Sequence, residues 1–158
     1  MLEWLENTQL SAWLRTDLWG WPLALTLHAL GTAIVVGFII IIGLRLLGLF
    51  ELIPYSSLKR LFPVVWAALV LQLISGFLLW MTKATRYVAD GAFVLKVLLM
   101  IVGVVLTVHF YQTMKREAST WDANGAVSSR AVPFVAAILV VWCSVLIAGR
   151  LTGYLGSL

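Results

Sequence analysis

Three ionisable side chains, His28, Lys96 and His109, lie within or at the edge of long apolar stretches of this 158-residue chain. Ionisable groups are expensive inside hydrocarbon, so they usually face a partner or a cofactor. A neutral imidazole is a common axial ligand of haem iron. A lysine amine ligates when deprotonated and pairs with a propionate when protonated. These residue types therefore make a cofactor site, such as a site for haem, one interpretation of the three positions.

The depths of these residues follow from the rise of an α-helix, about 1.5 Å per residue. Counted from the middle of its apolar stretch, His28 lies about 7.5 Å toward the side that holds both termini. Lys96 lies about 10.5 Å toward that same side, whereas His109 lies about 9 Å toward the other. His28 and Lys96 are thus matched in depth, and the two histidines, about 16 Å apart in height, do not share one iron. Because the chain has 2 histidines, two bis-histidine haems within one chain are excluded.

Each of these residues also has an interpretation without a cofactor. The imidazole of His28 can hydrogen-bond to a carbonyl or hydroxyl group of a neighbouring helix. The ammonium of Lys96 can snorkel to the interface near Asp90. His109, two residues before Tyr111, fits an interfacial position. The sequence leaves the cofactor interpretation and the structural one open.

The elements that would position these residues are membrane-spanning helices. The chain is 62% hydrophobic and 11% charged, whereas soluble domains carry about 25% charged residues. Charged residues are absent from four windows of 18 to 27 residues, and a spanning helix needs about 20 apolar residues. The composition excludes a soluble enzyme and predicts an all-α fold, an integral membrane four-helix bundle forming a single transmembrane domain over residues 1–158. The expected spans are residues 18–44, 61–82, 91–114 and 131–153.

An amphipathic helix is expected in the headgroup plane ahead of the first span, over about residues 2–17. Leu10, Trp13 and Leu14 recur there at helical spacing, with polar side chains between them. Thr16 or Asp17 is expected to cap the first span. Residues 83–90 are expected to form a tight charged link, and residues 115–130 the longest polar loop.

Small residues predict where helices approach one another closely. Gly31, Gly37 and Gly43 of the first span are expected to face other helices, because small residues let backbones come together in lipid. In the third span, Gly103 and Thr107 continue the face of Lys96. That face suits either a close helix contact or a flat cofactor.

The net charge of +4 comes from 11 basic residues that flank the spans, which suits anchoring at acidic headgroups rather than binding of nucleic acid. Five of them fall on the side of the termini and six on the other. This near tie favours only slightly a cytoplasmic location for the side with six. The single cysteine, Cys143, excludes an intrachain disulfide.

Two resemblances are carried by short motifs. The first rests on Trp13-Leu14-Arg15, Trp21-Pro22, Leu27-His28-Ala29-Leu30-Gly31 and Leu44-Arg45-Leu46-Leu47-Gly48. These motifs resemble an uncharacterised family of small bacterial four-span membrane proteins, which implies the four-span layout. Leu27-His28, Lys96 and His109, in this order, carry a fainter resemblance to HemJ-type protoporphyrinogen oxidases and CopD-like membrane domains. It implies that His28 and Lys96 bind haem b.

The leading hypothesis is a haem-b-binding integral membrane protein that serves electron transfer or a redox partner. His28 would be an axial iron ligand, and Lys96 a second ligand or a propionate partner. Arg150, on the same side near the end of the fourth span, would meet a propionate. The alternative is a non-catalytic membrane anchor or accessory subunit of a larger complex, and catalytic activity stays open. The expected location is the bacterial inner membrane as a multi-pass protein. The expected partners are the lipid bilayer and either a redox protein or the subunits of a complex. Nucleic acid is excluded as a partner. The sequence leaves the oligomeric state open.

Overall fold

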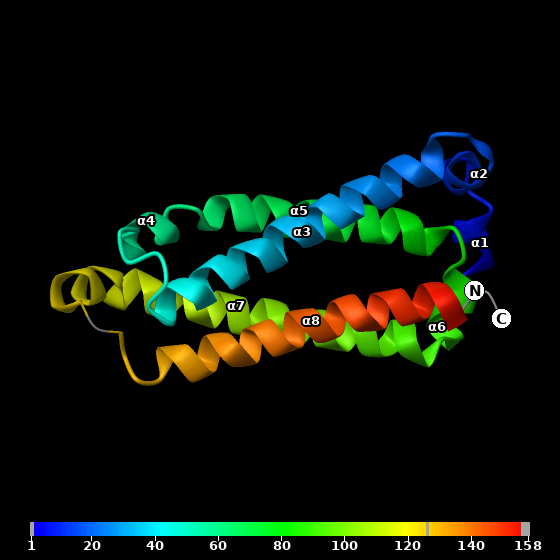
Figure 1. Ribbon diagram of the computed structural model, residues 1–158. Coiled ribbons are helices and arrows are strands. Elements are labelled where there is room, and N and C mark those ends of the chain that lie inside the picture. Colours follow the sequence, from blue (N-terminus) through cyan, green and yellow to red (C-terminus); the bar gives the residue numbers. More distant parts are fainter. Residues whose placement is uncertain (1, 126, 156–158) are drawn as a thin grey trace.

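The computed structural model describes residues 2–125 and 127–155, and its long elements are four α-helices (Figure 1). They are α3 (Gly20–Leu46), α5 (Phe62–Met81), α7 (Gly91–Asn124) and α8 (Ala131–Leu155). Short helices connect or precede them: α1 (Glu3–Glu6), α2 (Gln9–Thr16), α4 (Tyr55–Lys59) and α6 (Ala84–Ala89). The predicted all-α fold is confirmed, and each expected span coincides with most of one long helix, although α3, α7 and α8 continue past its end.

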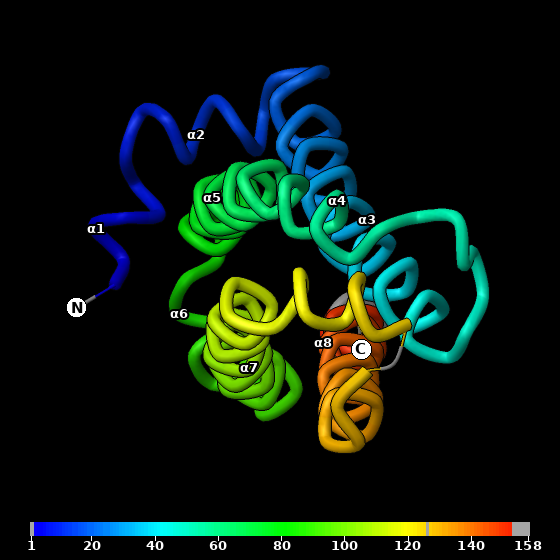
Figure 2. The backbone as a smooth tube through the Cα atoms, turned by 90° about the vertical axis from the view of Figure 1, so that its left-hand side faces the viewer, coloured from blue at the N-terminus to red at the C-terminus, as the bar shows by residue number. Residues whose placement is uncertain are grey.

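The four long helices form a bundle in which α3 packs along both α5 and α8, and α8 packs along α7. Seen end-on, they occupy four corners around a common axis (Figure 2). The helices α5 and α7 meet through aromatic rings at the end of the bundle away from the termini. There the ring of Tyr111 lies 4.7 Å from that of Phe62 and 5.8 Å from that of Trp66, measured between centroids.

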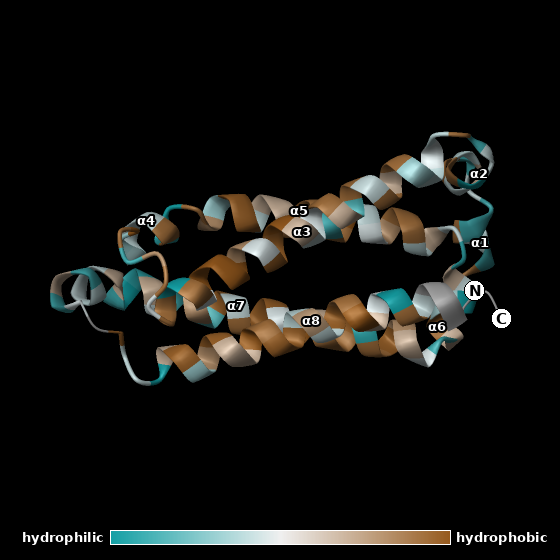
Figure 3. Cartoon of the chain, viewed as in Figure 1, coloured by the Kyte–Doolittle hydropathy of each residue, from teal (hydrophilic) through white to brown (hydrophobic). Residues whose placement is uncertain are grey.

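The surface of the bundle fits a membrane. Hydrophobic residues cover the middle of the long helices, and hydrophilic residues gather at the two ends (Figure 3). All four long helices have the length and composition to cross a bilayer, and α7 is the least covered by protein. Large apolar side chains such as Leu98, Val105 and Ile147 are exposed on the outside of the bundle. Since hydrocarbon is the solvent that favours such a surface, the protein is a membrane protein.

The N-terminal amphipathic segment consists of two helices rather than the single one expected. The Oγ1 atom of Thr8 accepts a hydrogen bond from the backbone N–H of Ser11 and caps α2, which separates it from α1. Neither Thr16 nor Asp17 is the N-cap residue of α3, which is Trp19 and has no side-chain cap. The carboxylate of Asp17 nevertheless accepts hydrogen bonds from the N–H groups of Trp19 and Gly20 just ahead of the helix.

Two connectors contain more helix than predicted. The tight link expected over residues 83–90 holds the short helix α6. The polar loop expected over residues 115–130 is wrong in its first part, because α7 continues to Asn124 and ends at Gly125 with φ +62°. Residues 115–124 contain no proline or glycine, and Trp121 is buried with its ring 5.5 Å from that of Tyr55 in α4. Packing against α4 therefore stabilises a helix in a polar segment that was expected to be a loop.

Two of the three glycines expected to pack do so. A Cβ atom at Gly31 would lie 3.0 Å from the carbonyl oxygen of Ala68 in α5, and one at Gly43 would lie 3.0 Å from Leu139 in α8. The expectation for Gly37 is wrong, because a Cβ atom there would meet nothing within 4 Å. Successive residues turn about 100° around a helix, so glycines six apart point to different sides.

The N-terminal helices are tied to the end of α5 and to α6 by polar contacts. The carboxylate of Glu6 accepts hydrogen bonds from the backbone N–H of Thr85, at 2.7 Å, and from its hydroxyl group. These bonds, with the hydroxyl contributing most, hold the pKa of Glu6 below its usual value. The guanidinium of Arg15 donates to the carbonyl oxygens of Glu6 and Thr82. The contacts join α1 and α2 to the loop that follows α5.

The attachment of α1 to α6 is expected to weaken in acid. Because the pKa of Glu6 is lowered in the folded state, its contribution is present above about pH 4 and is lost as the carboxyl group protonates below that value. Hydrogen exchange of the amides in α1 should therefore speed up between pH 5 and pH 3, after correction for the intrinsic rate. In Glu6→Gln the exchange should already be fast at pH 5. Glu3→Gln, in the same helix, should retain the pH dependence, and a loss there would contradict the role of Glu6.

Candidate functional site

The imidazole of His28 lies between α3 and α5, and both of its ring nitrogens have partners. Its Nδ1 lies 3.2 Å from the Oγ of Ser75, and its Nε2 lies 3.3 Å from the Nε2 of Gln72. The hydroxyl of Ser75 donates to the carbonyl oxygen of Leu71 at 2.6 Å, so its oxygen is free to accept from Nδ1–H. The amide of Gln72 donates to the Nε2 lone pair. The network therefore holds a neutral imidazole protonated at Nδ1.

The orientation of the Gln72 amide is set by Thr32. The hydroxyl of Thr32 lies 2.8 Å from Oε1 of Gln72 and 2.9 Å from the carbonyl oxygen of His28, and it can donate to either. Since Oε1 accepts from this hydroxyl, the NH₂ group of Gln72 is turned toward the imidazole. Gln72 and Ser75 are almost fully buried, and their polar atoms are satisfied within the bundle.

The sequence reasoning missed Gln72 and Ser75, although a signal was present. They are polar residues three apart in an otherwise apolar span, and residues at this spacing share one helix face. Gly76 is the next residue on that face. A Cβ atom at Gly76 would lie 3.0 Å from Cε1 of His28, so this glycine lets the imidazole approach the backbone of α5.

The side chain of Lys96 reaches sideways from α7 to α8. A Cβ atom at Gly149 would lie 3.3 Å from its Cε and 3.4 Å from its Nζ. Lys96 is five residues after Gly91 at the start of α7, and Gly149 is six residues before Leu155 at the end of α8. Both positions are therefore about 7.5–9 Å inside the helix ends. The ammonium thus lies between two helices rather than extended toward the interface.

The structure places His28 and Lys96 toward the same end of the bundle. His28 lies against Gly76 of α5, and Lys96 lies against Gly149 of α8. The four charge-free windows contain no Asp or Glu. The nearest acidic residue before Lys96 in the sequence is Asp90, whose Oδ1 accepts from the N–H of Ala92 at the start of α7. Two basic side chains therefore lie between helices at this end of the bundle, on spans that carry no acidic residue.

The small face that continues from Lys96 along α7 is filled by protein. A Cβ atom at Gly103 would lie 3.1 Å from the indole of Trp142 in α8, and the indole N–H donates to the Oγ1 of Thr107 at 3.2 Å. Trp142 is fully buried. Of the two interpretations of this face, the close helix contact is the one observed.

The remaining candidates, His109 and Arg150, are exposed rather than buried between helices. His109 is exposed, and its ring lies edge-on to that of Phe134 at 5.3 Å between centroids. Arg150 follows Gly149 on α8 and is also exposed, at the end of the bundle nearer the termini. Within residues 2–125 and 127–152, no cluster of three or more His, Cys, Asp or Glu side chains is suited to hold a metal ion.

Comparisons with protein families, with curated proteins and with solved structures find no match to this chain. Its function therefore has to be argued from the residues of the bundle.

Proposed function

We propose that this chain is a haem-b-binding membrane protein that serves electron transfer or a redox partner. One observation carries the proposal: His28 and Lys96 lie between helices toward the same end of the bundle, on spans that contain no acidic residue. A lysine without an acidic partner is costly in hydrocarbon. A haem offers anionic propionates to such a cation and an electron-deficient iron to the lone pair of the imidazole.

The donor set is compatible with haem. In the tautomer held by Ser75, Nε2 of His28 carries the lone pair that an axial ligand needs, and Ser75 orients the ring through Nδ1–H. The amide of Gln72, at 3.3 Å, has to turn away before Nε2 can ligate. Lys96 would serve as second ligand or as propionate partner, and Arg150 would pair with a propionate. A bound haem would supply one-electron chemistry, and the expected location is a bacterial inner membrane.

A second candidate function is that of a non-catalytic membrane anchor or accessory subunit. The observation that favours it is the closed network around His28, in which both ring nitrogens already have partners. In that case His28, Gln72 and Ser75 join α3 to α5, and the polar ends of the bundle dock the subunits of a complex.

The absorption spectrum of protein purified from haem-replete cells distinguishes the two candidates. Haem binding predicts a Soret band with about one haem per chain, and its absence would leave the anchor as the function. Replacement of Lys96 then separates its two roles. Lys96→Arg should preserve the spectrum if the cation pairs with a propionate, because Arg keeps the charge. The same variant should shift the reduced-minus-oxidised spectrum if the amine ligates the iron. Lys96→Leu, which has neither a charge nor a donor atom, should weaken haem retention in both cases.

A further inference from the structure

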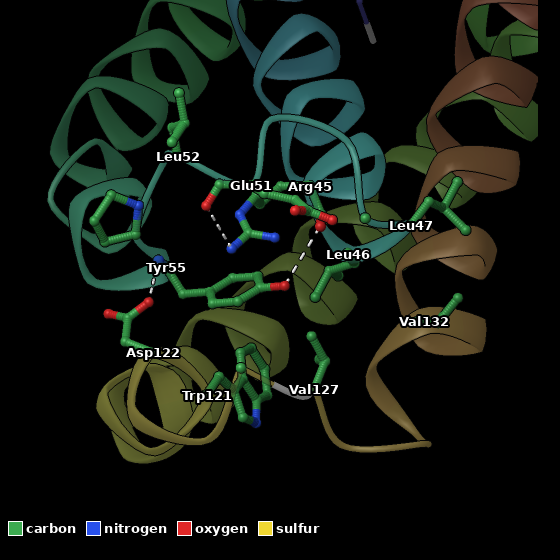
Figure 4. A pocket seen from close by; sticks show the side chains of 13 residues that line it. Arg45, Leu46, Leu47, Glu51, Leu52, Tyr55, Trp121, Asp122, Val127 and Val132 are labelled. Atoms are coloured by element: carbon green, nitrogen blue, oxygen red, sulfur yellow. Dashed lines mark hydrogen bonds between the residues drawn. The ribbon is translucent and has the colours of Figure 1, made fainter.

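A chamber of about 710 Å³ lies at the end of the bundle away from the termini (Figure 4). It is open on one side and is lined by the last turn of α3, the connector to α4, the last turn of α7 and the start of α8. Its walls carry the polar groups of Arg45, Glu51 and Asp122 and the rings of Tyr55 and Trp121. A volume of this size is in the range of ligand-binding pockets.

The guanidinium of Arg45 is held in place, and some of its N–H donors have no hydrogen-bond acceptor among the contacts described. It stacks 4.2 Å from the centroid of the Tyr55 ring, its Nε donates to the carbonyl oxygen of Ile53 at 2.7 Å, and its Nη2 donates to that of Glu51 at 3.2 Å. A guanidinium has five N–H donors, so about three remain for a ligand. A pre-oriented guanidinium with adjacent free donors suits a phosphate group.

The chamber also carries acidic groups. The two carboxylate oxygens of Asp122 accept from the backbone N–H groups of Tyr55, at 2.6 Å, and Ser56, at 3.1 Å, so this acid is engaged at the start of α4. Glu51 is exposed at the wall. One cation and two carboxylates disfavour a ligand that is only anionic. They favour one that carries a phosphate and an ammonium group together.

An apolar groove of about 50 Å³ continues from the chamber between α3 and α8. It shares Leu46, Leu47 and Val132 with the chamber and extends past Val135 and Leu139. The surrounding surface is strongly apolar, and Leu52 of the connector is 98% exposed. This end of the bundle therefore reaches the depth at which lipid headgroups meet acyl chains.

We propose that the chamber and groove bind one zwitterionic aminophospholipid of the phosphatidylethanolamine type. The lipid phosphate pairs with the free edge of Arg45, and the headgroup ammonium lies toward Glu51. The first carbons of one acyl chain follow the groove beside Gly43, and the rest of the chain lies on the outer surface of α3 and α8. This proposal is independent of haem.

Native mass spectrometry of the detergent-purified protein, titrated with lipid, tests this proposal. Phosphatidylethanolamine should give one retained lipid per chain and raise the melting temperature. Phosphatidylglycerol, glycerophosphoethanolamine and inorganic phosphate should each bind at least about tenfold more weakly, since they lack the ammonium or the acyl chains. Equal binding of phosphatidylglycerol would overturn the choice of headgroup, and equal binding of either soluble compound would overturn the lipid itself.

Three variants complete the test. Arg45→Gln should weaken lipid binding about tenfold or more, because charge-assisted hydrogen bonds to the phosphate are lost. The matched control is Arg60→Gln, which is exposed outside the chamber and should bind normally. Ala136→Phe keeps Arg45 and fills the groove that Ala136 lines. It should reduce retention of phosphatidylethanolamine without changing the oligomeric state. Unchanged binding in both Arg45→Gln and Ala136→Phe, with folding intact, would refute the site.

Discussion

Replacing His28 by alanine is expected to abolish the Soret absorbance of protein purified from haem-replete cells. Under the proposed function its Nε2 is the axial donor, and no other histidine of the described bundle lies near Lys96. The variant also leaves the buried amide of Gln72 without its acceptor. That loss costs about 1–3 kcal/mol. Absorption spectra and thermal unfolding in detergent measure the two effects separately.

His109→Ala is the matched control for His28→Ala. His109 lies in the exposed part of α7 beside Phe134, so its removal should leave both the spectrum and the melting temperature nearly unchanged. A Soret band that survives in His28→Ala but disappears in His109→Ala would refute the assignment of the ligand.

The variant Gln72→Leu distinguishes two roles of His28, as an iron ligand or as a residue that only joins α3 to α5. The amide of Gln72 is the group that occupies Nε2 of His28 in this structure. If Nε2 of His28 binds iron, removal of the Gln72 amide should leave the Soret band in place. If the network only joins the helices, the variant should lower the melting temperature of a protein that has no Soret band.

Gly31→Leu is expected to produce the largest loss of stability among the glycine variants of α3. A Cβ atom at Gly31 would already lie 3.0 Å from the carbonyl oxygen of Ala68 and 3.1 Å from Oε1 of Gln72. A leucine side chain must therefore push α5 away. Overpacking of this kind costs about 1–3 kcal/mol and occasionally more. The expected readouts are a lower yield and a melting temperature in detergent reduced by several degrees.

Gly37→Leu, six residues further along the same helix, provides the comparison. A Cβ atom there would meet nothing within 4 Å, so leucine should be tolerated. The two alanine variants, Gly37→Ala and Gly31→Ala, should change the free energy of unfolding in opposite directions. Gly37→Ala should stabilise by up to about 1 kcal/mol through helix propensity, whereas Gly31→Ala should destabilise. Equal effects at the two positions would show that the contact of Gly31 with α5 does not limit stability.

The four spans can be recognised from the amino-acid sequence. Each span is recognisable because a bilayer core accepts only helices with about 20 consecutive apolar residues, which is a property of local composition. The rise per residue also gives His28 and Lys96 similar depths without any tertiary information. In the structure both side chains lie toward the same end of the bundle, His28 against Gly76 and Lys96 against Gly149.

The contacts of each helix face can be seen only in the tertiary structure. Periodicity shows that a helix has faces, but the rotation of a helix against its neighbours depends on packing along the whole length of the bundle. For this reason Gly31 was placed correctly and Gly37 was not, and the small face of Gly103 proved to hold Trp142. The partners of His28, Gln72 and Ser75, come from a helix more than 40 residues away in sequence.

The polar end of α7 shows the same division. Residues 115–124 are polar and were expected to form a loop, yet they are helical, and in the structure Trp121 packs on Tyr55 and Asp122 binds the start of α4. The chamber around Arg45 exists only because this extension meets the connector after α3 and the start of α8. The span boundaries depend on local sequence because the free energy of transfer into hydrocarbon is a property of each segment by itself. The site and the chamber depend on contacts between distant segments, which no single stretch of sequence specifies.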